Sequence, residues 1–498
     1  MRSLFILAGL FWANTILMAS SNYYGLLPFR GEDVYTRITV DDDATVSISY
    51  PLHPLLPKGT MEANPFEYAE RAFPILDNTA SITFLRKHRK QWIIRYVSPA
   101  GSSEVPFYRE VEGPDPDQFE TYSGTYEDAD GRVLWVRTMR SRLRVVSPYS
   151  QEVLTLRPIG EGAFWASTGE RLRWEGDHIH WTSNEGSTRQ LTKSDRFTEE
   201  EVWVVSGADS LYGKLFVPSG EGPFPGCVVL QGGGSAGLAN YELEAKFFAM
   251  NGVATLLCNK AGEGQSKGPG QFWRQTFREK TGEYLNLFRF LARQPGVDPQ
   301  RVGVHGVSEG GRLALMMAQA EPEVAFVMAG AAPVMTMREG QLYAMDHYHR
   351  DLNIDEQTNL GIQQVWADYY QGIIDEDIDT TIIERANALR EVHQRVFLPP
   401  NSTRIPASPR AEDLLNASVV DDLPRVQCPV LLQYGEVDHR VNPYKSLEAI
   451  EQKLPGDTPR RTVLYPRAGH SFMTPEFQIS PGYLHDKINW LRSVEVLN

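Results

Sequence analysis

Gly306-Val307-Ser308-Glu309-Gly310-Gly311 is the stretch of sequence that decides the fold. An apolar run, residues 302–305, precedes it, and a helix-like run, residues 312–317, follows it. A serine at a sharp turn from a strand into a helix has its hydroxyl pushed out of the backbone, and flanking glycines let the two elements approach closely. The stretch therefore predicts a nucleophile elbow at Ser308, and the chemistry that it implies is nucleophilic acyl transfer.

The Gly-x-Ser-x-Gly spacing also occurs around Ser235 and around Ser266. Ser266 stands in a run of glycine, serine, lysine and proline with no helical pattern behind it, which is typical of a loop. Ser235 follows an apolar run, residues 227–230, but three consecutive glycines stand before it. Such glycines favour a loop that presents bare backbone N–H groups. The context therefore favours Ser308, and Ser235 is the alternative.

The elbow needs partners, because a serine hydroxyl is a poor nucleophile until a base takes its proton and a carboxylate orients that base. In enzymes with such an elbow the acid and then the histidine follow the serine along the chain. Asp438 follows an apolar run, residues 430–434, and His470 follows the next strand-like run, so both are expected at the carboxyl ends of strands. Glu436 is the alternative acid, and His439 is expected at the surface.

Hydrolysis also needs N–H donors where negative charge develops on the substrate oxygen. The glycine turn after residues 227–230 offers Gly233 and Gly234, and the residue after the nucleophile offers the amide of Glu309. The alternative is a glycine turn that only permits tight packing. This chemistry requires no organic cofactor and no metal. Two His-x-His pairs, at 178/180 and 347/349, lack carboxylate or cysteine companions and are expected to be structural.

Composition narrows the class of protein. With 498 residues the chain is too long for one ordinary core, so two or three domains are expected. The formal net charge is −14 and no basic run is present, which disfavours a nucleic-acid partner. The three cysteines, Cys227, Cys258 and Cys428, stand at or beside apolar runs and are expected to be buried thiols. The sequence gives no oligomeric state.

The first residues predict export. A short polar start is followed by an almost unbroken apolar stretch, residues 4–19, and then by small residues. This pattern is typical of a secretory signal peptide, here residues 1–21, and the stretch is shorter than a membrane span requires. We expect a secreted or periplasmic protein with no membrane span after cleavage; an uncleaved anchor is the alternative.

The remaining chain divides by its hydrophobic period. Residues 22–195 alternate apolar and polar residues between glycines, prolines and aspartates, which predicts a mostly antiparallel β domain, a small barrel or sandwich. Residues 196–498 alternate continuous apolar runs with helical patterns, which predicts an α/β domain with a doubly wound, mainly parallel sheet. Within it, residues 336–424 form a long aromatic-rich insertion that is expected to be a helical cap over the active site, or else a packing insert.

These residues resemble known families. Ser308, Asp438 and His470, in this order, resemble the α/β-hydrolase superfamily, and within it the prolyl oligopeptidase-like and dienelactone hydrolase-like exported hydrolases. Residues 258–266 are similar to an Asp-Lys-Arg-Gly-x-Gly-x-Ser turn of such proteins, although Asn259 and Ala261 depart from it. The strands between residues 122 and 181 resemble a lipocalin-like accessory domain.

The resemblance implies an exported serine hydrolase that cleaves carboxylic esters through an acyl-enzyme, with a small-molecule, lipid or glycan ester as substrate. The β-rich N-terminal region is too short for the seven-bladed propeller of true oligopeptidases, so esterase activity is expected before peptidase activity. The alternatives are a peptidase or acyltransferase with the same triad, and a glycan- or lipid-binding protein with a degenerate hydrolase domain.

Overall fold

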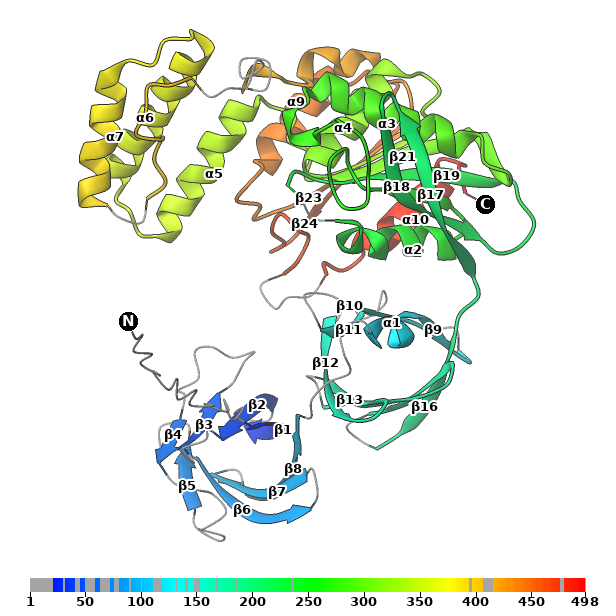
Figure 1. Ribbon diagram of the computed structural model, residues 1–498, viewed down its shortest axis with the longest axis vertical. Coiled ribbons are helices and arrows are strands. Elements are labelled where there is room, and N and C mark those ends of the chain that lie inside the picture. Colours follow the sequence, from blue (N-terminus) through cyan, green and yellow to red (C-terminus); the bar gives the residue numbers. More distant parts are fainter. Residues whose placement is uncertain are drawn as a thin grey trace, which may run out of the picture. The chain divides into compact units, whose positions relative to one another are not determined.

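The protein is described by a computed structural model (Figure 1). The structure describes residues 21–29, 32–40, 45–49, 59–62, 72–75, 80–88, 91–99, 101–110, 118–130, 132–138, 142–146, 153–166, 169–183, 186–234, 237–393, 396–405, 415–474 and 479–497. Residues 1–20 of the expected signal peptide, and Ser235, lie outside this set. The chain forms two compact units, of which the second is Ser194–Asn498 together with Val133–Trp135 and Val146–Val153.

The first unit begins with an antiparallel sheet, drawn in blue in Figure 1. Its strands are β1 (Ser21–Phe29), β2 (Glu32–Val40), β3 (Thr45–Ser49), β4 (Gly59–Glu62), β5 (Ala72–Ile75), β6 (Ala80–His88), β7 (Gln91–Ser98) and β8 (Gly101–Arg109). Their order is β4-β3-β2-β1-β8-β7-β6-β5. Ile38, Ile94 and Phe107 are fully buried on one face, so this sheet has an apolar core of its own.

A closed barrel follows the sheet, after the short helix α1 (Phe119–Tyr122). Its strands are β9 (Gly124–Asp128), β10 (Val133–Thr138), β11 (Leu143–Val146), β12 (Val153–Gly160), β13 (Ala163–Ala166), β14 (Arg171–Glu175), β15 (His178–Thr182) and β16 (Thr188–Lys193). β16 pairs antiparallel with β9, which removes the exposed strand edges. Buried and more exposed residues alternate along β14 and β15, as a strand with one buried face requires.

The second unit contains a mixed eight-stranded sheet in the order β17-β18-β20-β19-β21-β22-β23-β24. Its strands are β17 (Phe197–Ser206), β18 (Asp209–Pro218), β19 (Phe224–Leu230), β20 (Ala254–Cys258), β21 (Val297–Val307), β22 (Val327–Gly330), β23 (Val430–Gly435) and β24 (Arg460–Tyr465). β17 and β18 are antiparallel, and from β20 to β24 neighbouring strands pair in parallel. Their carboxyl ends therefore meet at one edge of the sheet.

Helices cover both faces of this sheet (Figure 1). They are α2 (Glu242–Met250), α3 (Phe277–Ala292), α4 (Glu309–Ala320), α9 (Pro443–Lys453) and α10 (Tyr483–Ser493), with the 3-10 turns η2 (Leu238–Asn240), η3 (Phe272–Arg274) and η4 (Val420–Arg425). One apolar core joins the sheet to α3, α4 and α9, and a second joins it to α2 and α10. Strands buried on both faces explain the continuous apolar runs in the sequence.

The long insertion between β22 and β23 is helical, and its helices run from yellow-green to yellow in Figure 1. It contains α5 (Met337–Asp351), α6 (Glu356–Ile374) and α7 (Thr380–Val392). Thr336, Asp355 and Asp379 cap the three helices by accepting hydrogen bonds from backbone N–H groups of the first turn. Ile362, Val365 and other apolar residues form a separate cluster between these helices. We call α5–α7 the helical insertion.

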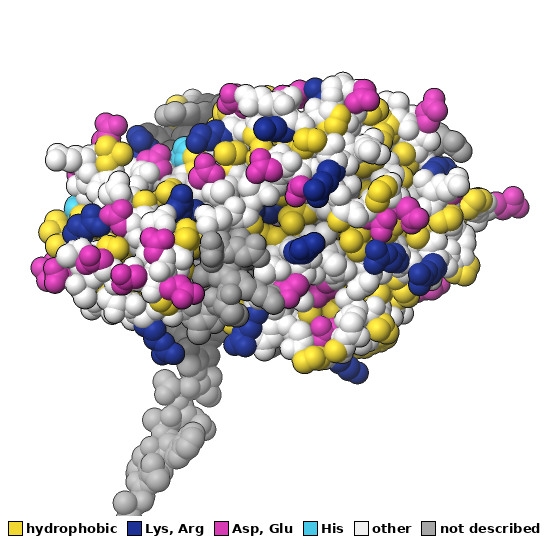
Figure 2. All heavy atoms as spheres, turned by 90° about the horizontal axis from the view of Figure 1, so that it is seen from above, with side chains coloured by type: hydrophobic (Ala, Val, Ile, Leu, Met, Phe, Trp, Pro, Cys, Tyr) yellow, Lys and Arg dark blue, Asp and Glu magenta, His cyan; other side chains and the backbone are white. Residues whose placement is uncertain are grey.

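The predicted fold class is confirmed: an antiparallel β region with a small barrel stands before an α/β domain with a mainly parallel sheet. The domain boundaries remain predictions. Cys227 and Cys258 are buried and Cys428 is half-buried, all as free thiols. None of the described helices has the length and hydropathy that crossing a bilayer demands. On the face drawn in Figure 2, acidic and basic side chains are interspersed, with no extended area of one sign among the described residues.

Candidate active site

Ser308 stands between β21 and α4 in a strained backbone conformation, with φ 61° and ψ −124°. A non-glycine residue at such a positive φ costs about 1–3 kcal/mol and needs close packing around it. The neighbouring glycines provide that packing. A Cβ on Gly306 would lie 2.4 Å from the carbonyl carbon of Gly310, and a Cβ on Gly310 would lie 2.5 Å from the Leu230 carbonyl oxygen. Strand and helix can meet this closely only where side chains are absent, so the geometry is that of a nucleophile elbow.

Asp438 and His470 contact each other at the carboxyl ends of β23 and β24. His470 Nδ1 lies 2.8 Å from Asp438 Oδ2, and Asp438 is almost fully buried. The backbone N–H groups of Arg440 and Val441 donate to the other carboxylate oxygen at 2.8 Å and 3.0 Å. Because these bonds fix the carboxylate, it holds the imidazole by Nδ1 and leaves Nε2 available as a base.

Glu436, the alternative acid, and His439, the histidine beside Asp438, have other contacts. Glu436 is exposed, and its Oε2 accepts a hydrogen bond from the Arg467 backbone N–H at 3.0 Å. His439 stacks on His347 of the helical insertion with ring centroids 4.5 Å apart. In the described structure, only Asp438 has a recorded carboxylate contact with His470.

The glycine turn after β19 lies against the elbow. A Cβ on Gly232 would be 3.6 Å from the Ser308 Cβ, and a Cβ on Gly233 would be 3.7 Å from Glu309 Oε2. The Gly232 N–H donates to the Tyr241 hydroxyl at 2.7 Å. The predicted donors Gly233 and Gly234 are both exposed, and neither backbone N–H has a recorded acceptor among the described residues. They are thus available to a ligand.

Glu309 is the first residue of α4, where backbone N–H groups have no partner inside the helix. Its carboxylate is held by the largely buried Lys280, which donates a hydrogen bond to Glu309 Oε1 at 2.9 Å. Because Lys280 binds the Glu309 carboxylate, this carboxylate does not bind the Glu309 backbone N–H beside Ser308. The positive end of the α4 dipole adds to the attraction for a developing negative charge at this point.

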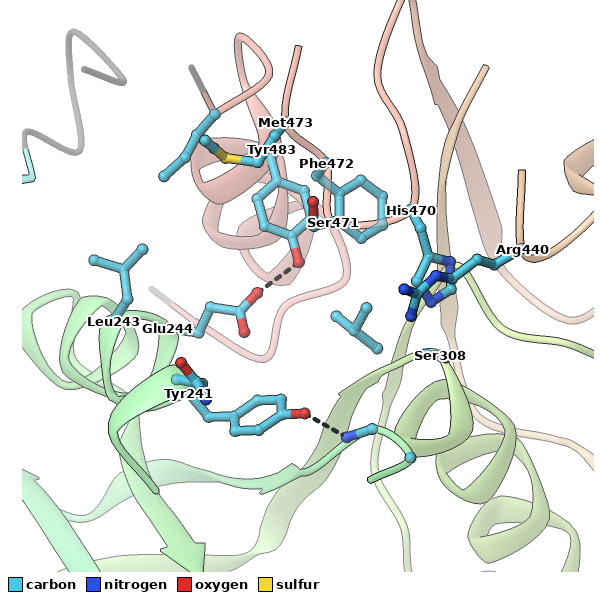
Figure 3. A pocket seen from close by; sticks show the side chains of 15 residues that line it. Tyr241, Leu243, Glu244, Ser308, Arg440, His470, Ser471, Phe472, Met473 and Tyr483 are labelled. Atoms are coloured by element: carbon cyan, nitrogen blue, oxygen red, sulfur yellow. Dashed lines mark hydrogen bonds between the residues drawn. The ribbon is translucent and has the colours of Figure 1, made fainter. Parts of the chain in front are cut away.

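A cavity of about 340 Å³ opens at Ser308 and His470 (Figure 3). Its wall is largely apolar and aromatic, with a few polar groups; the residues named in Figure 3 are Tyr241, Leu243, Glu244, Ser308, Arg440, His470, Ser471, Phe472, Met473 and Tyr483. This size is at the lower end of the range for small-molecule sites, about 300–1,000 Å³. The cavity therefore suits a compact substrate with an apolar part.

Glu244, an acidic residue of the cavity wall, has buried partners. Glu244 accepts a hydrogen bond from Tyr483 at 2.5 Å and lies 3.4 Å from the Lys487 Nζ. His305 Nε2 is 3.1 Å from the same carboxylate, as an ion-pair contact without hydrogen-bond geometry. Burial alone would raise the pKa of Glu244, but the electrostatic attraction of His305 and Lys487 and the hydrogen bond from Tyr483 lower it well below its usual value. Glu244 is consequently ionised and held in place.

The helical insertion is attached at both ends by one side chain. Arg312 of α4, 2% exposed, donates to the carbonyl groups of Pro333 and Met335 before the insertion and of Ala417 after it. Burial lowers the pKa of Arg312 to about 10. Farther along, Tyr343 of α5 donates to the Asp438 backbone carbonyl at 2.9 Å. The insertion thus contacts the loop that carries the acid.

The His-x-His pairs have ordinary partners. His178 contacts the Thr192 hydroxyl at 3.0 Å, and His180 lies 3.3 Å from a Glu175 oxygen. His349 is buried and contacts Asn359 at 2.9 Å. Across the described ranges, no group of three or more His, Cys, Asp or Glu residues has the geometry of a metal site.

Comparison with known proteins agrees with this geometry. The sequence profile of the prolyl oligopeptidase family matches residues 239–371, which contain the elbow and the start of the insertion. Over these residues the chain is similar to α/β hydrolases of the prolyl oligopeptidase-like kind. The matched segment ends before Asp438 and His470, so the roles of these two residues rest on their geometry.

The chain is similar at low identity to curated proteins. It is 24% identical to "Esterase FrsA" of Klebsiella pneumoniae over 259 residues, which are 50% of this chain and 60% of the relative. It is 30% identical to "Thiohydrolase aneE" of Aspergillus aculeatus over 134 residues, 27% of this chain and 41% of the relative. A solved putative dienelactone hydrolase from Klebsiella pneumoniae shares 14% identity over 60% of this chain and 97% of its own, with a TM-score of 0.37.

Sequence reasoning missed three groups at the site. Arg440 stands two residues after Asp438 and lines the cavity, Glu244 lies on a helix with no motif, and Lys260 lies under the glycine turn. Lys260 was inside the Asn-Lys-Ala-Gly segment that carried the family resemblance, so its position was visible in the sequence. Its contacts were not, because they join loops that are 28 residues apart in the chain.

Proposed function

We propose that this protein is an exported serine hydrolase that cleaves small carboxylic esters through Ser308, His470 and Asp438. The observation that carries the proposal is the 2.8 Å contact from Asp438 to His470 Nδ1, at the wall of a cavity that Ser308 also lines. A buried carboxylate that orients a histidine beside a strained serine is the arrangement that nucleophilic acyl transfer needs. The hydrolase family of the chain fits this chemistry.

In the proposed mechanism the Ser308 oxygen attacks the acyl carbon while His470 Nε2 takes the hydroxyl proton. Asp438 stabilises the imidazolium, and the amides of Gly233 or Gly234 and of Glu309 bind the oxyanion. When the tetrahedral intermediate collapses, the bond to the alkoxy group breaks and His470 returns the proton to the leaving alcohol. Water then attacks the acyl-enzyme by the same route and releases the acid with free Ser308.

The substrate class follows from the cavity. Its volume of about 340 Å³ and its apolar wall favour short acyl or small aromatic groups over a polymer segment. The names of the two relatives, an esterase and a thiohydrolase, support ester or thioester substrates. Peptidase or acyltransferase activity is a second candidate, because the family profile that matches is that of the prolyl oligopeptidases.

A substrate panel tests the proposal. We expect the purified protein to turn over p-nitrophenyl esters with short acyl chains, and we expect Ser308→Ala to abolish this turnover. Thioesters, peptide p-nitroanilides and alcohol acceptors in the same assay separate esterase, peptidase and transferase activities. Ser308→Ala with wild-type turnover on the esters would refute the assignment of the nucleophile.

Export is part of the proposal and has its own test. The apolar stretch of residues 4–19, with small residues after it, supports a cleaved signal peptide. Mass spectrometry of the mature protein from an expressing cell should find an N-terminus near residue 22 in the periplasm or medium. An intact N-terminus in the membrane fraction would indicate an uncleaved anchor instead.

A further inference from the structure

A buried lysine lies beneath the glycine turn that covers Ser308. Lys260 follows β20 and is 2% exposed. Its Nζ donates to the carbonyl oxygens of Gly232 at 2.6 Å and of Gly234 at 2.7 Å. No carboxylate is recorded within salt-bridge distance of this ammonium group among the described residues, and burial lowers the pKa of Lys260. A cation that is costly to bury is thus used to hold two backbone carbonyls.

The direction of those carbonyls determines the direction of the next amide. The peptide between Gly232 and Gly233 is trans, so the Gly233 N–H points away from the Gly232 carbonyl and therefore away from Lys260. Gly233 and Ser308 line the same cavity. The Gly232 N–H is already bonded to the Tyr241 hydroxyl. Of these two amides, the one left for a ligand on the cavity side is that of Gly233.

The positive charge of Lys260 also polarises the peptide that it binds. A peptide whose carbonyl accepts a hydrogen bond from a cation is polarised, and its N–H becomes a stronger donor. The Gly232–Gly233 peptide has this arrangement, with the lysine on one side and the cavity on the other. Negative charge that develops on a substrate oxygen would be stabilised through the peptide by a group that never touches the substrate.

We propose that Lys260 is a positioning residue of the oxyanion hole, which holds the glycine turn so that the Gly233 amide faces the reacting oxygen and strengthens that amide as a donor. The inference rests on the proposed function and deepens it. Gly233 lines the cavity and Gly234 is not among its lining residues, so the Gly233 amide is selected as the partner of the Glu309 amide.

The test compares Lys260→Met with Lys260→Arg and with the control Lys246→Met. Loss of one oxyanion-hole donor reduces kcat by about 10²–10³-fold, so a donor that is only loosened should cost about 10–100-fold. We expect Lys260→Met to lower kcat per active site on p-nitrophenyl acetate by this factor with KM changed little. Lys260→Arg should restore part of it, since a guanidinium group keeps the positive charge and can donate more than one hydrogen bond. Lys246 of α2 is paired with Glu199 of β17 and with Glu242 of α2, and its variant should keep wild-type kcat.

A transition-state analogue separates positioning from a structural role. The affinity for a trifluoromethyl ketone, whose serine adduct carries an oxyanion, should fall in Lys260→Met by the same factor as kcat/KM. A purely structural lysine would instead reduce the number of sites titrated by a fluorophosphonate and leave kcat per site and analogue affinity unchanged, which would overturn the inference. Lys260→Gln serves in the same assays if Lys260→Met does not fold. A wild-type protein without esterase activity would overturn the proposed function itself, whereas an active wild type with unaffected Lys260 variants would overturn only this inference.

Discussion

The barrel and the α/β sheet both contain eight strands, but their strand ends are used differently. In the barrel, neighbouring strands run antiparallel, so the ends of successive strands alternate between the two rims. In the α/β sheet, the strands from β20 to β24 run parallel, and their carboxyl ends gather at one edge. Ser308, Asp438 and His470 all follow strands at that edge. Parallel pairing brings together residues that are far apart in sequence, and hairpin pairing does not.

If the catalytic residues lie at the carboxyl edge of the parallel strands, substituting a histidine there should lower kcat far more than substituting a histidine in the barrel. We expect His470→Ala to lower kcat for ester hydrolysis by about 10⁶-fold, because the serine loses its base. His180→Ala, on β15 of the barrel, is the matched control and should leave kcat within about twofold of wild type, because the recorded ion-pair partner of His180 is Glu175 of the barrel. Steady-state kinetics of the two variants on one ester measures both effects. A large loss in His180→Ala would place part of the chemistry in the barrel.

Within the α/β edge, the acid can be assigned by exchanging carboxylates for amides. Asp438→Asn should lower kcat by about 10⁴-fold, since an amide cannot hold the imidazole in the required tautomer. Glu436→Gln, two residues earlier and on the protein surface, should change kcat by less than about threefold. The same kinetic assay ranks the two variants. Reversal of their order would show that Glu436, rather than Asp438, orients His470.

The barrel is expected to contribute stability in place of chemistry. Ile179 is fully buried in β15, so Ile179→Ala should lower the free energy of unfolding of the barrel by about 2–5 kcal/mol. Turnover per fluorophosphonate-titrated site should be unchanged at temperatures where the barrel is folded. Urea unfolding followed by tryptophan fluorescence, with kinetics in parallel, makes the measurement. A loss of kcat per site without unfolding would contradict this division of roles.

The smallest expected effect concerns the buried charges beside the cavity. The folded-state pKa of Glu244 is held below its ordinary value of 4.5, so its stabilisation is complete above that pH and is lost as the pH falls below it. The urea midpoint of wild type should therefore fall between pH 6 and pH 3, and the fall should be shallower in Glu244→Gln. Parallel curves for the two proteins would show that Glu244 gains nothing from His305 and Lys487.

The sequence predicted those features that depend on local patterns. The elbow at Ser308 needs small residues at fixed spacing, and the parallel strands show as continuous apolar runs, so both could be read before the structure was known. The separate sheet β1–β8 was not distinguished from the barrel, because both have the same strand pattern. Lys260 and Glu244 were missed for a related reason. Their roles depend on contacts between loops and helices that no local pattern records.

Labelling with a fluorophosphonate tests the central claim most directly. The mature protein is incubated with the probe, digested, and the modified peptide is located by mass spectrometry, with Ser308→Ala and His470→Ala alongside. The account predicts stoichiometric label on Ser308 in wild type, no label in Ser308→Ala and strongly slowed labelling in His470→Ala, because the serine is activated by that base. Label on another serine, or labelling of wild type no faster than of His470→Ala, would contradict the account.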